Sequence, residues 1–146
     1  MKLGVHDLLI RQAGQTNQEV FSDTKKLVKA VDDLGYDRYW FAEHHGFENL
    51  LSVAPEILAT HFLSSTDNLT IGTGGTMIMH YSPLKIAETF KTMAELYPGR
   101  VDLGIGRAPG SGPREIRALN QDFSNKSRDL YDEIKVILDY LEDIKP

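Results

Sequence analysis

The segment YWFAEHHG places an acid and two imidazoles directly after a run of aromatic residues. The run Tyr39 to Phe41 predicts a strand buried on both faces, and Glu43, His44 and His45 follow where that strand should leave the sheet. An imidazole gains or loses a proton near neutral pH, and Glu43 would orient one imidazole or keep it charged. The pattern predicts an acid–base site, and the alternative is an ordinary pair of loop histidines.

The segment GTGGTM, Gly72 to Met77, contains three glycines near the end of another predicted strand. Glycine weakens strand pairing and usually marks a bulge or a close approach of another group to the backbone. One interpretation is a bend in the sheet. The other, compatible with the first, is a flat ligand ring lying against this backbone.

The segment GIGRAPG, Gly104 to Gly110, follows the fourth predicted strand and contains Arg107. Free backbone N–H groups and a planar guanidinium together suit a phosphate group. The G-x-G-x-x-x-G spacing does not fit a dinucleotide fingerprint, and no second strand ending in an acid follows at the required distance. We therefore expect a phosphate-bearing ligand without a Rossmann fold. Arg114 and Arg117 are interpreted as the solvated face of a short helix or as residues that close over the phosphate.

Four histidines, His6, His44, His45 and His80, are the candidates for a competing metal site. The chain has neither HxH nor HExxH spacing, so we predict no metal, and a metal-dependent hydrolase remains the weaker alternative. His61 is interpreted as an ordinary helix residue.

Apolar runs with strand character alternate with longer amphipathic segments, which predicts repeated βα units in one domain over residues 1–146. Short strands joined by long crossovers should pair in parallel, and ligands of such sheets bind beyond the carboxyl ends of the strands. The predicted strands are Leu3 to Ile10, Arg38 to Ala42, Leu69 to Met79 and Val101 to Ile105.

Helix boundaries are indicated by capping residues and prolines. Thr16 and Glu19 have capping-box spacing, and Gly35 ends the first helix. Pro55 and Pro83 are placed as first-turn prolines, with Ser52 and Ser82 as possible caps. A polar loop is expected from Arg107 to about Lys126. The residues expected to face the core are Val20, Leu27, Val31 and Leu34 in the first helix; Ile86, Ala87, Phe90, Met93 and Ala94 in the third; and Leu130, Ile134, Ile137, Leu138 and Leu141 in the last.

Composition excludes several classes of partner. The formal net charge is −5 and basic residues are not clustered, so neither nucleic acid nor an anionic membrane surface is an expected partner. The absence of cysteine suits a reducing compartment, and the first residues lack the features of a signal peptide. We expect a cytoplasmic protein.

Four segments in order, YWFAEHH, SVAPEILATHFL, IGTGGTMIMHYSPLKIAETF and LYPGRVDLGIGRAPG, resemble the bacterial luciferase-like flavin monooxygenases. The resemblance covers nearly the whole chain. It implies a (β/α)8 barrel that binds reduced FMN, delivered by a separate flavin reductase, and uses O2 to oxygenate a small organic substrate.

The resemblance also implies roles for individual residues. His44 matches the active-site histidine beside the flavin, and Arg107 resembles the phosphate-binding arginine. Gly74 and Gly75 match the pair at which this family often has a non-prolyl cis peptide against the isoalloxazine. Strand one ends in DLLIRQ, where many relatives have a small residue and a proline beside the flavin.

A complete barrel of this kind needs roughly 250 residues, whereas this sequence contains four βα units. Half a barrel would leave two unpaired strand edges and an exposed inner face, which we expect to be apolar and to drive association. The chain is therefore expected to form a homodimer or to depend on a missing C-terminal half, with an incomplete FMN site. The alternative is a non-catalytic, self-associating half-barrel with weak or no flavin binding.

Overall fold

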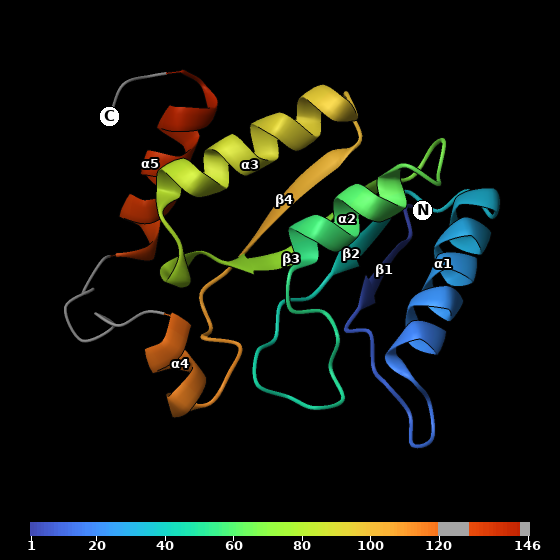
Figure 1. Cartoon of the computed structure of the whole chain (residues 1–146). Coiled ribbons are helices and arrows are strands. Elements are labelled where there is room, and N and C mark those ends of the chain that lie inside the picture. The colour runs from blue at the N-terminus through green and yellow to red at the C-terminus, as the bar shows by residue number, and fades with distance from the viewer. Residues whose placement is uncertain (120–128, 144–146) are drawn as a thin grey trace.

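The computed structural model describes residues 1–119 and 129–143. Within these residues four strands form one parallel sheet in the order β1-β2-β3-β4, and helices follow the strands along the chain (Figure 1). The strands are β1 (Gly4–Asp7), β2 (Arg38–Phe41), β3 (Thr70–Met77) and β4 (Val101–Gly106). The helices are α1 (Asn17–Asp33), α2 (Pro55–Leu63), the short 3-10 helix η1 (Ile78–His80), α3 (Pro83–Leu96), α4 (Pro113–Leu119) and α5 (Leu130–Leu141). The predicted parallel βα units are confirmed.

The first and third strands are shorter than predicted. In β1 the Asp7 carboxylate accepts a hydrogen bond from the Leu9 backbone N–H, and Leu9 has a φ of 51°. This backbone turns away from the sheet, so β1 ends at Asp7 and not at Ile10. β3 ends at Met77 because the next three residues form η1.

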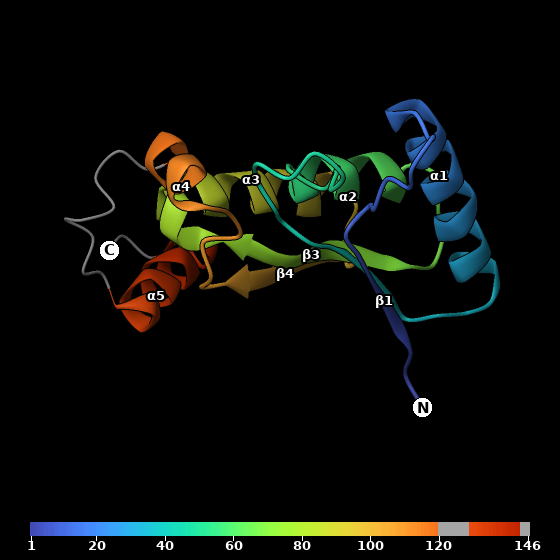
Figure 2. The ribbon, with the colours of Figure 1, turned by 90° about the horizontal axis from the view of Figure 1, so that it is seen from below.

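The strand register separates the two faces of the sheet. His6 is paired with Trp40, Trp40 with Gly72 and Gly72 with Asp102, so these four positions lie on one face. Figure 2 shows α2 and α3 on the opposite side of the sheet. The face that carries His6, Trp40, Gly72 and Asp102 is called the open face here, and Trp40 is 37% exposed on it. The prediction that the aromatic run is buried on both faces is therefore wrong for Trp40.

The open face carries polar groups where an apolar surface was expected. The Asp102 carboxylate accepts hydrogen bonds from Arg38 Nε at 2.8 Å and from Trp40 Nε1 at 2.9 Å. These contacts cross from β2 to β4 over Gly72 of β3, which has no side chain in the way. This part of the sheet therefore exposes polar side chains together with apolar ones, since Trp40 and Ile105 are also exposed.

The helix-covered face holds the hydrophobic core. Tyr39 and Phe41 are fully buried, and the Phe41 ring stacks on Phe62 of α2 with ring centroids 5.4 Å apart. The Tyr39 hydroxyl donates to the Asp7 carboxylate, and burial together with this bond raises the pKa of Tyr39. Further members of the core are Leu9, Val20, Val28, Val31, Ala59, Leu63, Leu69, Ile71, Ile78, Ile86, Phe90, Met93 and Ile137.

Most of the predicted helix signals are found. Thr16 and Glu19 form the capping box of α1, and Gly35 follows the helix with a φ of 74°. Pro55 and Pro83 begin α2 and α3. Ser52 is not the cap of α2, because its hydroxyl donates to the Ala42 carbonyl, and Ser82 occupies the N-cap of α3 without a side-chain bond.

Some residues predicted to face the core are exposed. In α1 the buried stripe includes Thr24 and Val28, which turns Leu27 to the surface, and Leu34 lies beyond the last helical residue. Ala94 and Leu138 are also exposed. The predicted loop from Arg107 to Lys126 contains α4, and its residues 120–126 lie outside the described part of the chain. Among the residues that the structure describes, no helix has the length and apolar character needed to cross a membrane.

A buried aspartate joins the end of α1 to the start of β3. The Asp32 carboxylate is 4% exposed and accepts hydrogen bonds from the backbone N–H groups of Asp67, Asn68 and Leu69. Burial alone would raise the pKa of Asp32, but the three N–H donors outweigh it and lower the pKa. The ionised form is therefore the one that stabilises the fold.

We predict that Asp32→Asn lowers the free energy of unfolding at pH 7 by about 2 kcal/mol. The asparagine side chain would have to turn its NH2 group toward at least one of the three backbone N–H donors, which would lose its acceptor. A lowered folded pKa gives stability that is present above the unfolded value of about 3.9 and is lost as the pH falls through the folded pKa. Urea unfolding between pH 7 and pH 2 should show this acid loss in the parent and a smaller loss in the variant. Equal acid losses would contradict the role of Asp32.

A second prediction concerns Gly72, the residue under the bridge between β2 and β4. A Cβ atom there would lie 1.9 Å from the Asp102 carbonyl oxygen, whereas a Cβ at Gly4 would be 3.4 Å from Arg38. We expect Gly72→Ala to cost about 2 kcal/mol or more and the matched Gly4→Ala to cost less than about 1 kcal/mol. Urea unfolding of both variants tests this, and equal costs would refute it.

Candidate functional site

The loops that follow β2, β3 and β4 meet at one edge of the sheet. Parallel pairing brings all the carboxyl ends of the strands to this edge. The acid and two histidines follow β2, and η1 follows β3. β4 extends to Gly106, so the segment predicted as a Gly-rich turn begins within the strand, and only its part from Arg107 onward is a loop. Figure 1 shows the ends of β2, β3 and β4 on the same side of the sheet. The three segments singled out in the sequence are therefore gathered at the same end of the sheet.

Hydrogen bonds join these loops directly. The His45 backbone N–H donates to the Gly110 carbonyl at 2.8 Å, and His80 Nε2 donates to the Pro109 carbonyl at 2.8 Å. A Cβ at Gly46 would lie 2.4 Å from the Glu115 side chain, so α4 approaches the histidine loop closely. The Gly-rich loop is thus held against both of its neighbours.

Glu43 is the acid of this site and is 0% exposed. Its Oε1 accepts from His45 Nε2 at 2.7 Å and from the Tyr81 hydroxyl, and its Oε2 accepts from the Met77 backbone N–H at 2.7 Å. Burial and the bond to Glu43 raise the pKa of Tyr81, so this hydroxyl keeps its proton. The imidazole that Glu43 holds is therefore that of His45.

His44, the predicted active-site histidine, is half-buried on the same loop. Its backbone N–H donates to the Ser52 carbonyl at 3.0 Å, and its ring packs edge-on against Phe47 with centroids 6.2 Å apart. Its Nδ1 is shielded from solvent and has no hydrogen-bond partner among the described residues. A buried polar atom of this kind is suited to pairing with a ligand.

The predicted glycine pair forms a close-packed part of the open face. The Gly74–Gly75 peptide is cis, and His6 Nε2 is hydrogen-bonded to the Gly74 carbonyl. A Cβ at Gly74 would lie 2.9 Å from the Trp40 Cβ, and one at Gly75 would lie 2.6 Å from the Ile105 carbonyl carbon. Beside this pair is a hollow of about 410 Å³, lined by His6, Trp40, Thr73, Gly74, Gly75, Gly104 and Ile105.

Arg107 directly follows β4 and is exposed. The register pairs Met77 with Gly106, so Arg107 begins its loop beside the end of β3. Arg114 and Arg117 lie on α4 and are also exposed. These cations lie near the loops that carry the histidines, where an anionic group of a ligand could be held.

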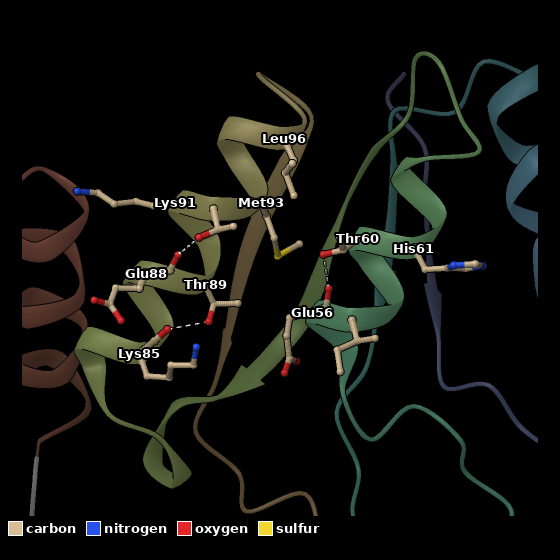
Figure 3. A pocket seen from close by; sticks show the side chains of 11 residues that line it. Glu56, Thr60, His61, Lys85, Glu88, Thr89, Lys91, Met93 and Leu96 are labelled. Carbon is tan, nitrogen blue, oxygen red and sulfur yellow. Dashed lines mark hydrogen bonds between the residues drawn. The ribbon is translucent and has the colours of Figure 1, made fainter.

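A larger concave surface lies elsewhere, between α2 and α3. Figure 3 shows this groove of about 900 Å³, with Glu56, Thr60, Lys85 and Thr89 on its walls. Burial is the main cause that raises the pKa of Glu56. The groove has no glycine-lined surface, and the predicted site residues do not line it. Size alone therefore does not identify the functional site.

Sequence reasoning did not place three contributors at the site, and it considered one of them, His6, only as a metal ligand. Trp40 and His6 line the hollow, and the alternation of side chains along β1 and β2 is the signal that would have placed them on one face. Tyr81 lies 38 residues from Glu43 and has no local signal. His61 is an exposed helix residue, as predicted, and within the described residues no three or more His, Cys, Asp or Glu are arranged to hold a metal ion.

Three comparisons with known proteins bear on this site. The Escherichia coli (strain K12) luciferase-like monooxygenase is 38% identical over 136 residues, covering 93% of this chain and 41% of the relative. The crystal structure of apo-MsnO8 matches 96% of this chain and 42% of its own, with a TM-score of 0.89 and 38% identity. The Pseudomonas putida oxygenating constituent of 3,6-diketocamphane monooxygenase, solved with FMN, has a TM-score of 0.79 at 22% identity over 97% of this chain and 38% of its own.

The last of these similarities concerns the fold alone, and it agrees with parallel units of a TIM-type barrel. The chain spans about two fifths of the length of the curated relatives that it matches. The family model described as luciferase-like monooxygenase matches residues 1–145. The chain therefore belongs to the luciferase-like monooxygenase family.

Proposed function

We propose that this chain supplies the flavin-binding side of a luciferase-like, flavin-dependent monooxygenase that oxygenates a small organic substrate. The observation that carries the proposal is the meeting of three segments at one sheet edge, namely the His44 loop, the Gly74–Gly75 pair and the Arg107 loop. When bound, reduced FMN supplies the two electrons with which one oxygen atom of O2 enters the substrate and the other leaves as water.

The glycine pair is proposed as the surface for the isoalloxazine ring. The fit rests on the hollow beside Gly74 and Gly75 and on the absence of side chains at both positions. A flat ring needs a bare surface, and any Cβ at these glycines would collide with β2 or β4. Trp40 and Ile105 add apolar walls that would keep water from one side of the ring.

His44 is proposed as the acid–base group. Its Nδ1 is shielded from solvent and has no partner among the described residues, so a bound ligand would complete its hydrogen bonding. Histidine is the side chain best suited to exchanging a proton near neutral pH. We therefore assign to His44 the holding and return of a proton at the reacting atoms.

Arg107 is proposed to bind the FMN phosphate. It lies at the start of the Gly-rich loop, and the hydrogen bond from His45 to Gly110 holds that loop against the histidines. A guanidinium forms two parallel hydrogen bonds to a phosphate, which fixes the ligand's orientation as well as its affinity.

The proposed assembly needs other components. A separate flavin reductase would deliver reduced FMN, and either a second copy of the chain or a C-terminal half would close the barrel. β1 and β4 are the outermost strands of the described sheet, and each has one side without a partner strand, where additional strands would pair. Without closure, the remaining contacts to phosphate and substrate are lacking and the FMN site stays partial.

The second candidate is a non-catalytic, self-associating half-barrel with weak or no flavin binding. It is favoured by the chain's coverage of about two fifths of its relatives. FMN titration followed by absorbance, combined with native mass spectrometry, separates the two candidates. Tight binding of one FMN per chain in a dimer supports the enzyme, and a dimer that leaves FMN unbound supports the alternative.

We predict different effects for His44→Ala and Arg107→Ala. The first should lower oxygenation of a panel of small aldehydes, ketones and thioethers about 100-fold and change the FMN Kd less than about 3-fold. The second should raise the FMN Kd about 10-fold, because it removes a charge-assisted bond to phosphate. The assay supplies reduced flavin through a reductase, and the Kd comes from fluorescence titration.

Two surface variants are the matched controls for this experiment. His61→Ala removes an exposed histidine from α2, and Lys26→Ala removes a positive charge from α1. Both should behave like the parent chain. Equal effects of His44→Ala and Arg107→Ala on rate and affinity would refute the division of roles.

A further inference from the structure

Glu43 is a fully buried carboxylate whose three hydrogen-bond donors come from three different places. His45 belongs to the same loop, Met77 is the last residue of β3, and Tyr81 follows η1. Burying a carboxylate is costly unless its oxygens are hydrogen-bonded, so the three donors offset the cost of burying Glu43. None of the roles in the proposed function belongs to Glu43, and the sequence left open which imidazole it orients.

We propose that Glu43 is the positioning residue of the candidate site. It holds the His45 imidazole through Nε2–H and fixes the loops after β2, β3 and β4 in one arrangement. The role deepens the proposed flavin function and rests on it, because the loops that are fixed carry His44 and Arg107 and adjoin the end of β3, which contains the glycine pair. Glu43 itself touches no reacting atom in this assignment.

The bonds to His45 explain how Glu43 acts on the loop after β4. Because the Glu43 carboxylate can only accept, His45 Nε2 must carry a proton. The backbone N–H of the same residue donates to the Gly110 carbonyl, and its ring packs edge-on to His80, with centroids 6.3 Å apart. His80 donates in turn to Pro109. His45 therefore transmits the position of Glu43 to the Arg107 loop.

The bond to Met77 explains how Glu43 acts on the glycine pair. Met77 is two residues beyond Gly75, and its N–H donates to Glu43 Oε2 at 2.7 Å. This contact sets the end of β3 relative to the loop that contains His44. Because Gly74 and Gly75 sit between close neighbours on β2 and β4, a shift at Met77 would move the surface proposed for the ring.

A carboxylate is required because all of the contacts are from donors. A glutamine at this position has one carbonyl oxygen and one NH2 group, so it must turn the NH2 group toward at least one N–H or O–H donor. Glu43→Gln preserves the size of the side chain while breaking this pattern. It is therefore a test of the hydrogen bonding and not of packing.

The experiment compares the parent chain, Glu43→Gln and Thr66→Ala by ¹⁵N-histidine NMR and FMN titration. Thr66 is buried and hydrogen-bonded to Arg100 and Phe62, at the opposite end of β3 from Glu43, so its variant controls for a general loss of stability. In the parent, the His45 Nε2 proton should be protected from exchange and directly visible. Thermal unfolding of all three chains checks that they are folded.

We expect Glu43→Gln to abolish the protected His45 ring proton and to raise the FMN Kd about 10-fold. Thr66→Ala should keep the ring proton and change the Kd less than about 3-fold at a comparable fall in Tm. An unchanged ring proton in Glu43→Gln, or equal changes in both variants, would overturn the positioning role. If Glu43→Gln does not fold, an Nδ1-protonated, Nε2-free His45 in the parent would overturn it as well.

The two proposals fail in different ways. If the parent chain does not bind FMN, the flavin function is overturned. Loss of the protected His45 ring proton in Glu43→Gln would still support the hydrogen bond by which Glu43 positions His45. If FMN binds equally to the parent and to Glu43→Gln, the positioning role is overturned and the flavin function stands.

Discussion

Parallel pairing in a single register is the constraint on which the rest of the structure depends. Each connection between consecutive strands contains a helix, and the carboxyl ends of all four described strands lie at one edge of the sheet. Because of this, segments separated by tens of residues in the sequence become neighbours. The carboxylate of Glu43 then joins the ends of β2 and β3, and His45 extends the connection to the loop after β4.

The two faces of the sheet carry different kinds of side chain. The face toward α2 and α3 carries the buried aromatic and aliphatic side chains that stabilise the fold. The other face carries glycines, Trp40 and the polar bridge from Asp102 to Arg38. A face of this kind gains little from apolar burial but leaves backbone accessible to a ligand. Most of the apolar burial that stabilises the sheet is therefore on the face covered by helices.

The sequence was sufficient to predict the parallel βα units, the capping box at Thr16 and the glycine that ends α1, because each depends on local patterns. It also identified the three segments that meet at the sheet edge. It could not show which imidazole Glu43 holds, since that depends on Tyr81 and Met77 at distant positions. Nor did it separate Trp40 from its buried neighbours, because an aromatic run hides the alternation between faces.

The proposed function requires FMN to bind at the edge of the sheet formed by the carboxyl ends of the strands. The most direct measurement is a map of amide chemical-shift changes when FMN is titrated into the ¹⁵N-labelled chain. The account predicts the largest changes at His44, Gly74, Gly75 and Gly104. Changes confined to the groove between α2 and α3, at residues such as Thr60 and Thr89, or no changes at millimolar FMN, would contradict it.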